Sequence, residues 1–419
     1  MAAAIDSRIA AAYGPPSRGR GGSPGAGPGT VNPPLRTGPA AASASIRSGR
    51  LRDCAIVTLI ALASRVICVL IGAGSKFGAT LDGRLPATDL LSLFVRWDAG
   101  WYLRIVATGY EASTWPQEQF GATPHAFFPG YPLLIRAAVA VTGLEPATAG
   151  IAVSTLLFVL ALCLVYEYAR DLGLARDIAI AATLLIACAP HSFVFSSIYT
   201  ESTFLFLLVA AMLALRRRQY LWAGVAAALL SGVRPNGIVF VVFALAWTLR
   251  TAGWRPLLQP WTAPGPMLTI VLAPLGLIAY WWFCYVTTGD AFAQATSIAH
   301  GWGWEFGWPW TNLGRHLRGS STDRFWAWGS ILYFAISLLL LRFRMYEEFA
   351  FCLACFLLYW VNVLPQSLIR YALVLFPVFI ALAHVTSKRP LALATLVAGL
   401  AAINGFLMVG FALQWRIAV

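Results

Sequence analysis

The sequence predicts an all-α integral membrane protein that crosses the bilayer many times. Of its 419 residues, 59% are hydrophobic and only 11% are charged, whereas soluble domains carry about 25% charged residues. Several apolar runs reach the roughly 20 residues that a transmembrane helix needs. The net charge of +13 is not gathered into a nucleic-acid patch, so we interpret it as the charge bias that orients membrane proteins.

The apolar runs divide the chain into a tail and one membrane domain. Residues 1–50 are rich in Gly, Pro, Ala and Arg and lack an apolar core, so we expect a disordered basic cytoplasmic tail and no cleavable signal peptide. Residues 51–419 form the membrane domain. About eleven spans are expected, near 53–72, 149–168, 177–194, 200–215, 219–233, 236–250, 267–287, 327–341, 347–363, 367–385 and 390–413.

The positions of the arginines predict the orientation. More than half of the 30 Lys and Arg residues lie in the tail and in short loops such as RDLGLARD and RRRQY, which therefore face the cytoplasm. This orientation requires that residues 130–143 do not cross, and we expect a surface or re-entrant helix there. Two long segments, about 73–148 and 288–326, then lie outside the cytoplasm.

Metal and cofactor motifs do not stand out. The seven cysteines all lie in apolar runs, and the pair Cys352 and Cys355 has no second pair to complete a zinc site. No phosphate-binding loop of the GxxxxGK[ST] type occurs. We expect no protein-bound cofactor and no metal site, although the sequence leaves a loosely bound divalent ion open.

The stretch FVRWDAGWYLRIVATGY, residues 94–110, carries an acid in an unusual place. At about 100° per residue, the apolar side chains form one broad face with Asp98 in its middle, while Arg96 and Arg104 fall on the opposite face. An ionised carboxylate is poorly solvated there, so the position of Asp98 calls for a function or for an ion-pair partner.

Other polar residues flank the spans at the same outer end. Ionisable residues at membrane depth usually face a cavity or a pathway. One carboxylate with several cations suits transfer from a phosphate-activated sugar, because the phosphate leaves without prior protonation and arginine binds it bidentately. Glycosidases normally need two carboxylates. The candidate site residues are Trp97, Asp98, His125, His191, Tyr199, Glu201, Arg234, Asn236 and Arg370.

Each candidate also has a plainer interpretation. Asp98 could be a helix cap, Glu201 could favour a helix N-terminus, and Arg234 could extend toward the membrane surface. His191 and Tyr199 could be ordinary interfacial residues. The outer segment 288–326 holds five tryptophans that form either an interfacial belt or a stacking surface for a sugar or lipid head group; they are Trp302, Trp304, Trp308, Trp310 and Trp326.

Five blocks in this order resemble the PIG-V type of membrane mannosyltransferases: RWDAGWYLRIVATGY, AFFPGYPLLIR, PHSFVFSSIYTESTF, GVRPNG and IRYALVLFPVFIALA. The resemblance implies a GT-C-type helix bundle with a helical first outer loop that carries the catalytic acid. By carry-over, Trp97 and Asp98 match the family's Trp-Asp pair, and Asp98 is the general base. Where the family often has histidine, at or near position 101, this sequence has Trp101.

The resemblance also implies an activity. We expect an inverting hexosyltransferase that moves mannose from a polyprenyl-phosphate donor to a lipid-linked or glycolipid acceptor at the extracytoplasmic face, in a bacterial inner membrane. The alternative from another class is a transporter or flippase of a lipid-linked sugar. Such proteins often show internal repeats, and we find none. A third alternative is a non-catalytic subunit of a membrane complex.

Overall fold

A computed structural model describes residues 39–82, 90–110 and 122–418 of the chain, with residues up to 48 forming a unit separate from the rest. Residues 1–38 of the expected tail lie outside the described residues, and the first helix begins at Pro39. The described residues contain helices and no β-strand beyond one isolated bridge between Phe306 and Asn362.

Nineteen α-helices are described. Their bounds in chain order are α1 Pro39–Leu81, α2 Asp98–Thr108, α3 Gly130–Thr142, α4 Pro146–Asp171, α5 Arg176–Cys188, α6 Glu201–Arg216, α7 Tyr220–Val233, α8 Phe240–Ala252, α9 Arg255–Leu258, α10 Pro264–Leu272, α11 Leu275–Thr288, α12 Ala293–Trp302, α13 Pro309–Arg318, α14 Ser321–Ser337, α15 Leu339–Arg342, α16 Tyr346–Trp360, α17 Leu368–Ala372, α18 Phe376–Thr386 and α19 Pro390–Ala412.

The expected spans fall on helices, but the count of eleven crossings is not confirmed. Six helical segments are long and apolar enough to cross a membrane, namely Gly49–Leu81, Pro146–Asp171, Pro235–Ala252, Pro264–Thr288, Ser321–Arg342 and Pro390–Ala412. The chain is therefore an integral membrane protein. Helices α5, α6, α7, α16 and α18 have 11 to 16 residues each, shorter than the roughly 20 that a straight crossing needs.

Proline and glycine set many of the helix boundaries. Pro146 and Pro390 start α4 and α19 at positions where a missing N–H costs nothing. Gly143 ends α3 in the left-handed conformation that glycine adopts freely. The segment 130–143, expected not to cross, forms the 13-residue helix α3, which is about 20 Å long.

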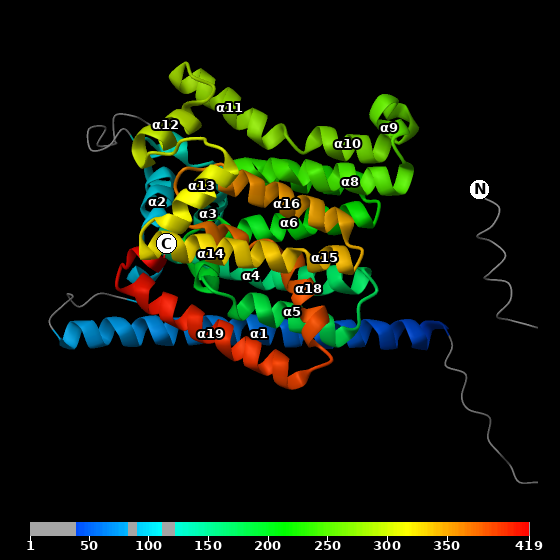
Figure 1. Ribbon diagram of the computed structural model, residues 1–419, viewed down its shortest axis with the longest axis horizontal. Coiled ribbons are helices and arrows are strands. Elements are labelled where there is room, and N and C mark those ends of the chain that lie inside the picture. The colour runs from blue at the N-terminus through cyan, green and yellow to red at the C-terminus, as the bar shows by residue number, and fades with distance from the viewer. Residues whose placement is uncertain (1–38, 83–89, 111–121, 419) are drawn as a thin grey trace, which may run out of the picture. The chain divides into compact units, whose positions relative to one another are not determined.

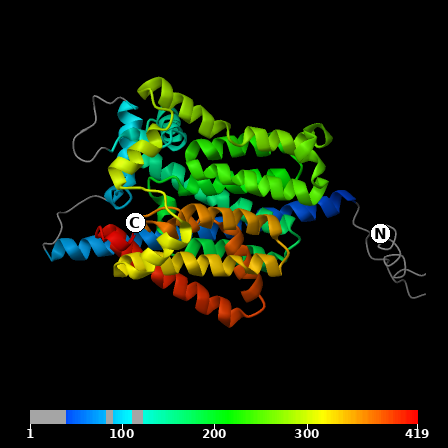
Figure 2. The same cartoon turned by 45° about the horizontal axis from the view of Figure 1, so that its top comes forward.

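The helices of the membrane domain pack into one bundle around α4, α6 and α7 (Figure 1). The contacts of α6 with α4 and of α6 with α7 are the most extensive. Helices α7 and α11 approach closely because glycines meet, and a Cβ on Gly276 would lie 2.0 Å from the carbonyl oxygen of Ala228. Figures 1 and 2 show that α2, α3, α12 and α13 gather at one end of this bundle.

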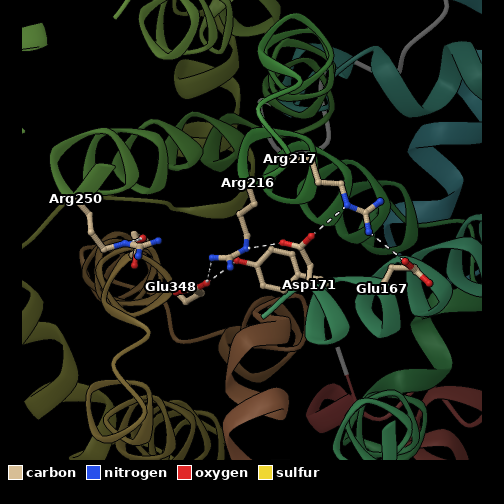
Figure 3. A network of polar contacts seen from close by, with 8 residues as sticks. Glu167, Asp171, Arg216, Arg217, Arg250 and Glu348 are labelled. Atoms are coloured by element: carbon tan, nitrogen blue, oxygen red, sulfur yellow. Dashed lines mark hydrogen bonds and ion pairs between the residues drawn. The ribbon is translucent and has the colours of Figure 1, made fainter. Parts of the chain in front are cut away.

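The opposite end of α6 carries a network of ion pairs (Figure 3). Arg216 pairs with Asp171 at 3.2 Å and lies 3.7 Å from Glu348, and Arg217 bonds Glu167 at 3.1 Å. Glu348 also accepts a hydrogen bond of 2.6 Å from Tyr168. These contacts join the ends of α4 and α6 to the start of α16, and they place the arginine-rich loops together, away from the start of α6.

Candidate active site

Asp98 is the first residue of α2. A carboxylate in the first turn is favoured by the helix dipole. Behind it, Tyr102 packs edge-on against Phe127 and Tyr131, with ring centroids 5.2 and 5.3 Å apart, which fixes α2 against α3. The Asp98 side chain is 26% exposed, so it lies at the boundary between the protein interior and the outside.

Four charged side chains form an alternating row of carboxylates and guanidinium groups. Both terminal nitrogens of Arg370 donate to Oδ2 of Asp98, at 3.2 and 3.3 Å. The Nε of Arg370 lies 3.6 Å from Oε1 of Glu201. That same oxygen accepts a hydrogen bond of 3.2 Å from Nη1 of Arg234. The row therefore runs Asp98, Arg370, Glu201, Arg234 and draws on α2, α17, α6 and the end of α7.

Burial increases toward the middle of this row. Glu201 is fully buried and Arg370 is 4% exposed, whereas the side chain of Arg234 is 15% exposed. Two positive and two negative charges compensate one another, as buried ionised groups require. Oδ2 of Asp98 is engaged by Arg370, and no donor among the described residues is seen to bind Oδ1. The carboxylate can therefore accept a proton on that second oxygen.

Two tyrosines hold the guanidinium groups in place. The ring of Tyr371 lies under both arginines, 4.9 Å from the guanidinium carbon of Arg234 and 5.3 Å from that of Arg370. Tyr199 lies 4.9 Å from Arg370, and its hydroxyl donates to the carbonyl oxygen of Arg96 at 3.2 Å. Cation–π contacts of this kind fix the planes of the guanidinium groups. The sequence singled out Tyr199 but missed Tyr371, although Tyr371 directly follows Arg370.

The backbone around the row is strained in three places. The backbone φ angles of Trp97, His191 and Ser367 are 50°, 66° and 68°. Residues other than glycine rarely adopt such positive φ angles. Trp97 precedes Asp98, and Ser367 precedes the short helix that carries Arg370. Strained residues persist only where their surroundings force them, and they cluster at functional sites.

His191 lies in the turn after α5 and is fully buried. Buried Arg65 of α1 fixes this turn, because its guanidinium donates to the carbonyl oxygens of Ser192 and Ala187. Arg65 was not among the residues predicted from the sequence, although an arginine inside an apolar span indicates a buried partner.

Two candidates lie apart from the row. Asn236 donates to the hydroxyl of Tyr359 at 3.4 Å, and Tyr359 in turn donates to the backbone of Tyr371. Asn236 is thus a supporting residue. His125 lies 3.4 Å from the hydroxyl of Thr287 and among aromatic rings, and burial lowers its pKa. None of its described contacts reaches the four charged residues.

An open cavity of about 300 Å³ is lined by Trp97, Gly100, Trp101 and Arg104, which flank Asp98 in the sequence. The helical wheel had placed Arg104 on the face opposite Trp97 and Trp101. In the structure all four residues line the same cavity, as their spacing of i, i+3, i+4 and i+7 requires at about 100° per residue, so the expected placement of Arg104 was wrong.

The five tryptophans of segment 288–326 do not form one surface. Trp302 packs against Trp101 with ring centroids 5.6 Å apart, beside the cavity. Trp326 is fully buried in α14, whereas Trp308 and Trp310 are 75% and 63% exposed. Within the described part of the chain, no group of three His, Cys, Asp or Glu side chains is placed to hold a metal ion.

Comparison with known proteins identifies relatives. The family model described as mannosyltransferase (PIG-V) matches residues 85–336, a range that includes Asp98, Glu201 and Arg234. The GPI alpha-1,6-mannosyltransferase 2 of Mus musculus is 30% identical over 208 residues, which are 46% of this chain and 40% of the mouse protein. The crystal structure of the Archaeoglobus fulgidus oligosaccharyltransferase aligns with a TM-score of 0.44 and 15% identity, over 85% of this chain and 55% of that one.

Proposed function

This chain belongs to the mannosyltransferase (PIG-V) family, and on that premise we propose that it transfers mannose from a polyprenyl-phosphate donor to a lipid-linked or glycolipid acceptor. The family supports a glycosyltransferase over a transporter or a non-catalytic subunit. A GT-C-type mechanism with inversion at the anomeric carbon fits a site with one accessible carboxylate. The name of the mouse relative refers to GPI. The match covers 40% of the mouse protein, so we do not transfer that acceptor to this chain.

The observation that carries the proposal is the carboxylate of Asp98, which is held on Oδ2 by Arg370 while the side chain remains 26% exposed. In the proposed step, Oδ1 takes the proton of an acceptor hydroxyl while the hydroxyl oxygen bonds to the anomeric carbon of mannose. The bond from that carbon to the phosphate oxygen breaks, and polyprenyl phosphate leaves as an anion. The acceptor oxygen attacks from the face opposite the leaving group, so the configuration inverts.

The two arginines have different tasks in this proposal. Arg370 uses both terminal nitrogens on Asp98 and is almost fully buried, so it positions the base. Arg234 is more exposed and has one nitrogen on Glu201, so it can offer donors to the phosphate of the donor lipid. Glu201 holds both arginines. Trp97, beside the cavity, is proposed to contact the substrate, whereas Tyr199, His191, Asn236 and His125 shape the surroundings.

We place the site at the extracytoplasmic face. Arg216, Arg217 and Arg250 lie at the other end of the bundle, in the ion-pair network around Glu347 and Glu348, and short arginine-rich loops favour the cytoplasm. The 16 residues of α6 separate Glu201 from Arg216 by about 24 Å. The alanine-rich composition favours a bacterial inner membrane.

Transfer of labelled mannose from polyprenyl-phosphate mannose in membranes tests the proposal. Asp98→Asn keeps the size of the side chain but removes the base, so we expect the rate to fall by about 10²- to 10⁴-fold. The matched control is Asp323→Asn, the same chemical change at the capping box that starts α14, which should leave the rate near that of the unaltered protein. Full activity of Asp98→Asn would end the assignment of Asp98 as base.

A further inference from the structure

One face of α2 carries a cavity, and none of the four charged residues of the row lines it. Trp97, Gly100, Trp101 and Arg104 follow the spacing of successive helical turns and line this cavity of about 300 Å³. Pockets for small ligands hold about 300–1,000 Å³, so this cavity is at the small end of the range. It suits one ring with its substituents and not a prenyl chain.

The walls of the cavity are two indole rings held in different ways. Trp101 is stacked on Phe127, with centroids 5.4 Å apart and planes 17° apart, and it contacts Trp302 on another side. Its orientation is therefore fixed. Trp97 is 45% exposed although its backbone is strained. A bulky residue in that conformation is a genuine outlier, and such strain persists only where the surrounding structure imposes it.

Gly100 forms the floor between the two indoles. A Cβ built on Gly100 would meet no atom of the described residues within 4 Å, and the φ of Gly100 lies outside the left-handed range. Neither packing against the described residues nor backbone conformation therefore requires glycine here. Glycine also weakens a helix relative to other residues. What the missing side chain provides is open space above α2.

We propose that this cavity binds a hexose ring. The apolar C–H face of a pyranose fits the electron-rich face of an indole, and the guanidinium of Arg104 can donate to ring hydroxyls or to a phosphate attached to the ring. The inference rests on the proposed function, which requires a hexose within reach of Asp98. That ring is either the mannose of the donor or a sugar of the acceptor.

A larger side chain at Gly100, which would fill the floor of the cavity, tests the inference. In Gly100→Leu the new Cβ meets no atom of the described residues and leucine is a better helix former than glycine, so folding should be preserved. The matched control is Gly399→Leu, because Gly399 is also an exposed helical glycine with nothing within 4 Å of its Cβ. The probes are labelled polyprenyl-phosphate mannose and, as acceptor, the lipid extract of cells that lack this protein.

We expect Gly100→Leu to raise an apparent KM by more than about tenfold, while Gly399→Leu leaves both KM values unchanged. A rise for the labelled donor alone identifies the donor mannose in the cavity, and a rise for the lipid extract alone identifies an acceptor sugar. Unchanged KM values for both substrates, whatever happens to kcat, would overturn the inference. If Asp98→Asn is inactive in the same membranes, the proposed function survives that outcome.

Discussion

At the scale of single residues, the site depends on how Arg370 and Arg234 divide their hydrogen bonds. Arg370 gives both terminal nitrogens to one oxygen of Asp98, Oδ2, and in the proposed step the other oxygen takes the proton. Arg234 shares Glu201 with Arg370 but remains 15% exposed. A contact to phosphate should therefore depend on Arg234, and the orientation of the base should depend on Arg370.

Replacement of Arg234 by lysine tests this division. Lysine keeps the charge but loses the planar fork that binds phosphate bidentately. We expect the KM for polyprenyl-phosphate mannose to rise about tenfold, the equivalent of about 1.4 kcal/mol, with a smaller change in kcat. Arg250→Lys, in the ion pair with Glu347 at the other end of the bundle, is the control. A fall in kcat at unchanged KM would instead indicate that Arg234 acts on the catalytic base, Asp98, and not on the phosphate of the donor.

The sequence predicted the members of this site better than their pairing. Asp98, Glu201, Arg234 and Arg370 were all singled out because each is ionisable and flanks an apolar run. The contact between Asp98 and Arg370 joins positions 272 residues apart, and no local pattern contains that information. Tyr371 was not predicted as a site residue for a related reason, because its role follows only from the packing of the two arginines on its ring.

At the scale of elements, the site is built where helices break. Arg370 sits on α17, a helix of five residues that begins after Ser367 with φ 68°. Glu201 begins α6 after the irregular segment 189–200, and Arg234 lies between α7 and the turn at Pro235. Irregular backbone at membrane depth is tolerated where it is buried in protein or lines a cavity, and the segment 189–200 and Ser367 are buried.

The start of α17 allows a stability test. Glycine adopts the left-handed conformation freely, whereas that conformation costs other residues about 1–2 kcal/mol. Ser367→Gly should therefore keep or raise the midpoint of thermal unfolding in detergent. Ser367→Val should lower it, because β-branched residues tolerate positive φ poorly. If glycine destabilised the protein and valine did not, the turn before Arg370 would have another conformation.

Helix α2 shows where sequence periodicity was insufficient. The helical wheel assumed an unbroken helix through residues 94–110. In the structure the helix begins at Asp98, and the chain bends at Trp97. The apolar inward face, with Tyr102 and Ile105 buried, agrees with the pattern. Positions 97 and 104 are seven residues apart, a spacing that puts both on one face of a helix, so the expected placement of Arg104 on the opposite face was wrong. The strain at Trp97, by contrast, cannot be read from residue types.

At the scale of the whole membrane domain, α6 separates two charged assemblies. One is the nearly neutral row at its start, and the other is the arginine-rich network at its end (Figure 3). Membrane topology follows from arginine-rich loops, so the two ends should face opposite compartments.

Accessibility to a membrane-impermeant thiol reagent tests this topology. Thr311 is exposed in α13, beside the end of α16, and Gln219 is exposed in the loop after α6. We expect Thr311→Cys to be labelled in intact cells and Gln219→Cys to be labelled only after permeabilisation. The unaltered protein, whose seven described cysteines are buried or half-buried, provides the background. Reversed labelling would place the site in the cytoplasm.

Membrane location and helical class followed directly from composition, but the number of crossings did not. Segments such as 177–194 and 367–385 read as continuous apolar runs. In the structure α5 ends at Cys188, before Pro190, and the last of these runs is divided into α17 and α18. Short broken helices and full spans have the same hydropathy, so only packing distinguishes them.

The most direct test of the link between Asp98 and Arg370 is a double-mutant cycle on mannosyl transfer. Rates are measured for Asp98→Asn, Arg370→Met and the double variant, with thermal unfolding in detergent to confirm that each is folded. If Arg370 acts by positioning Asp98, the double variant should be no slower than Asp98→Asn alone, since residues that act as a unit are not additive. Losses that multiply would show that the two residues act independently and would contradict this assignment.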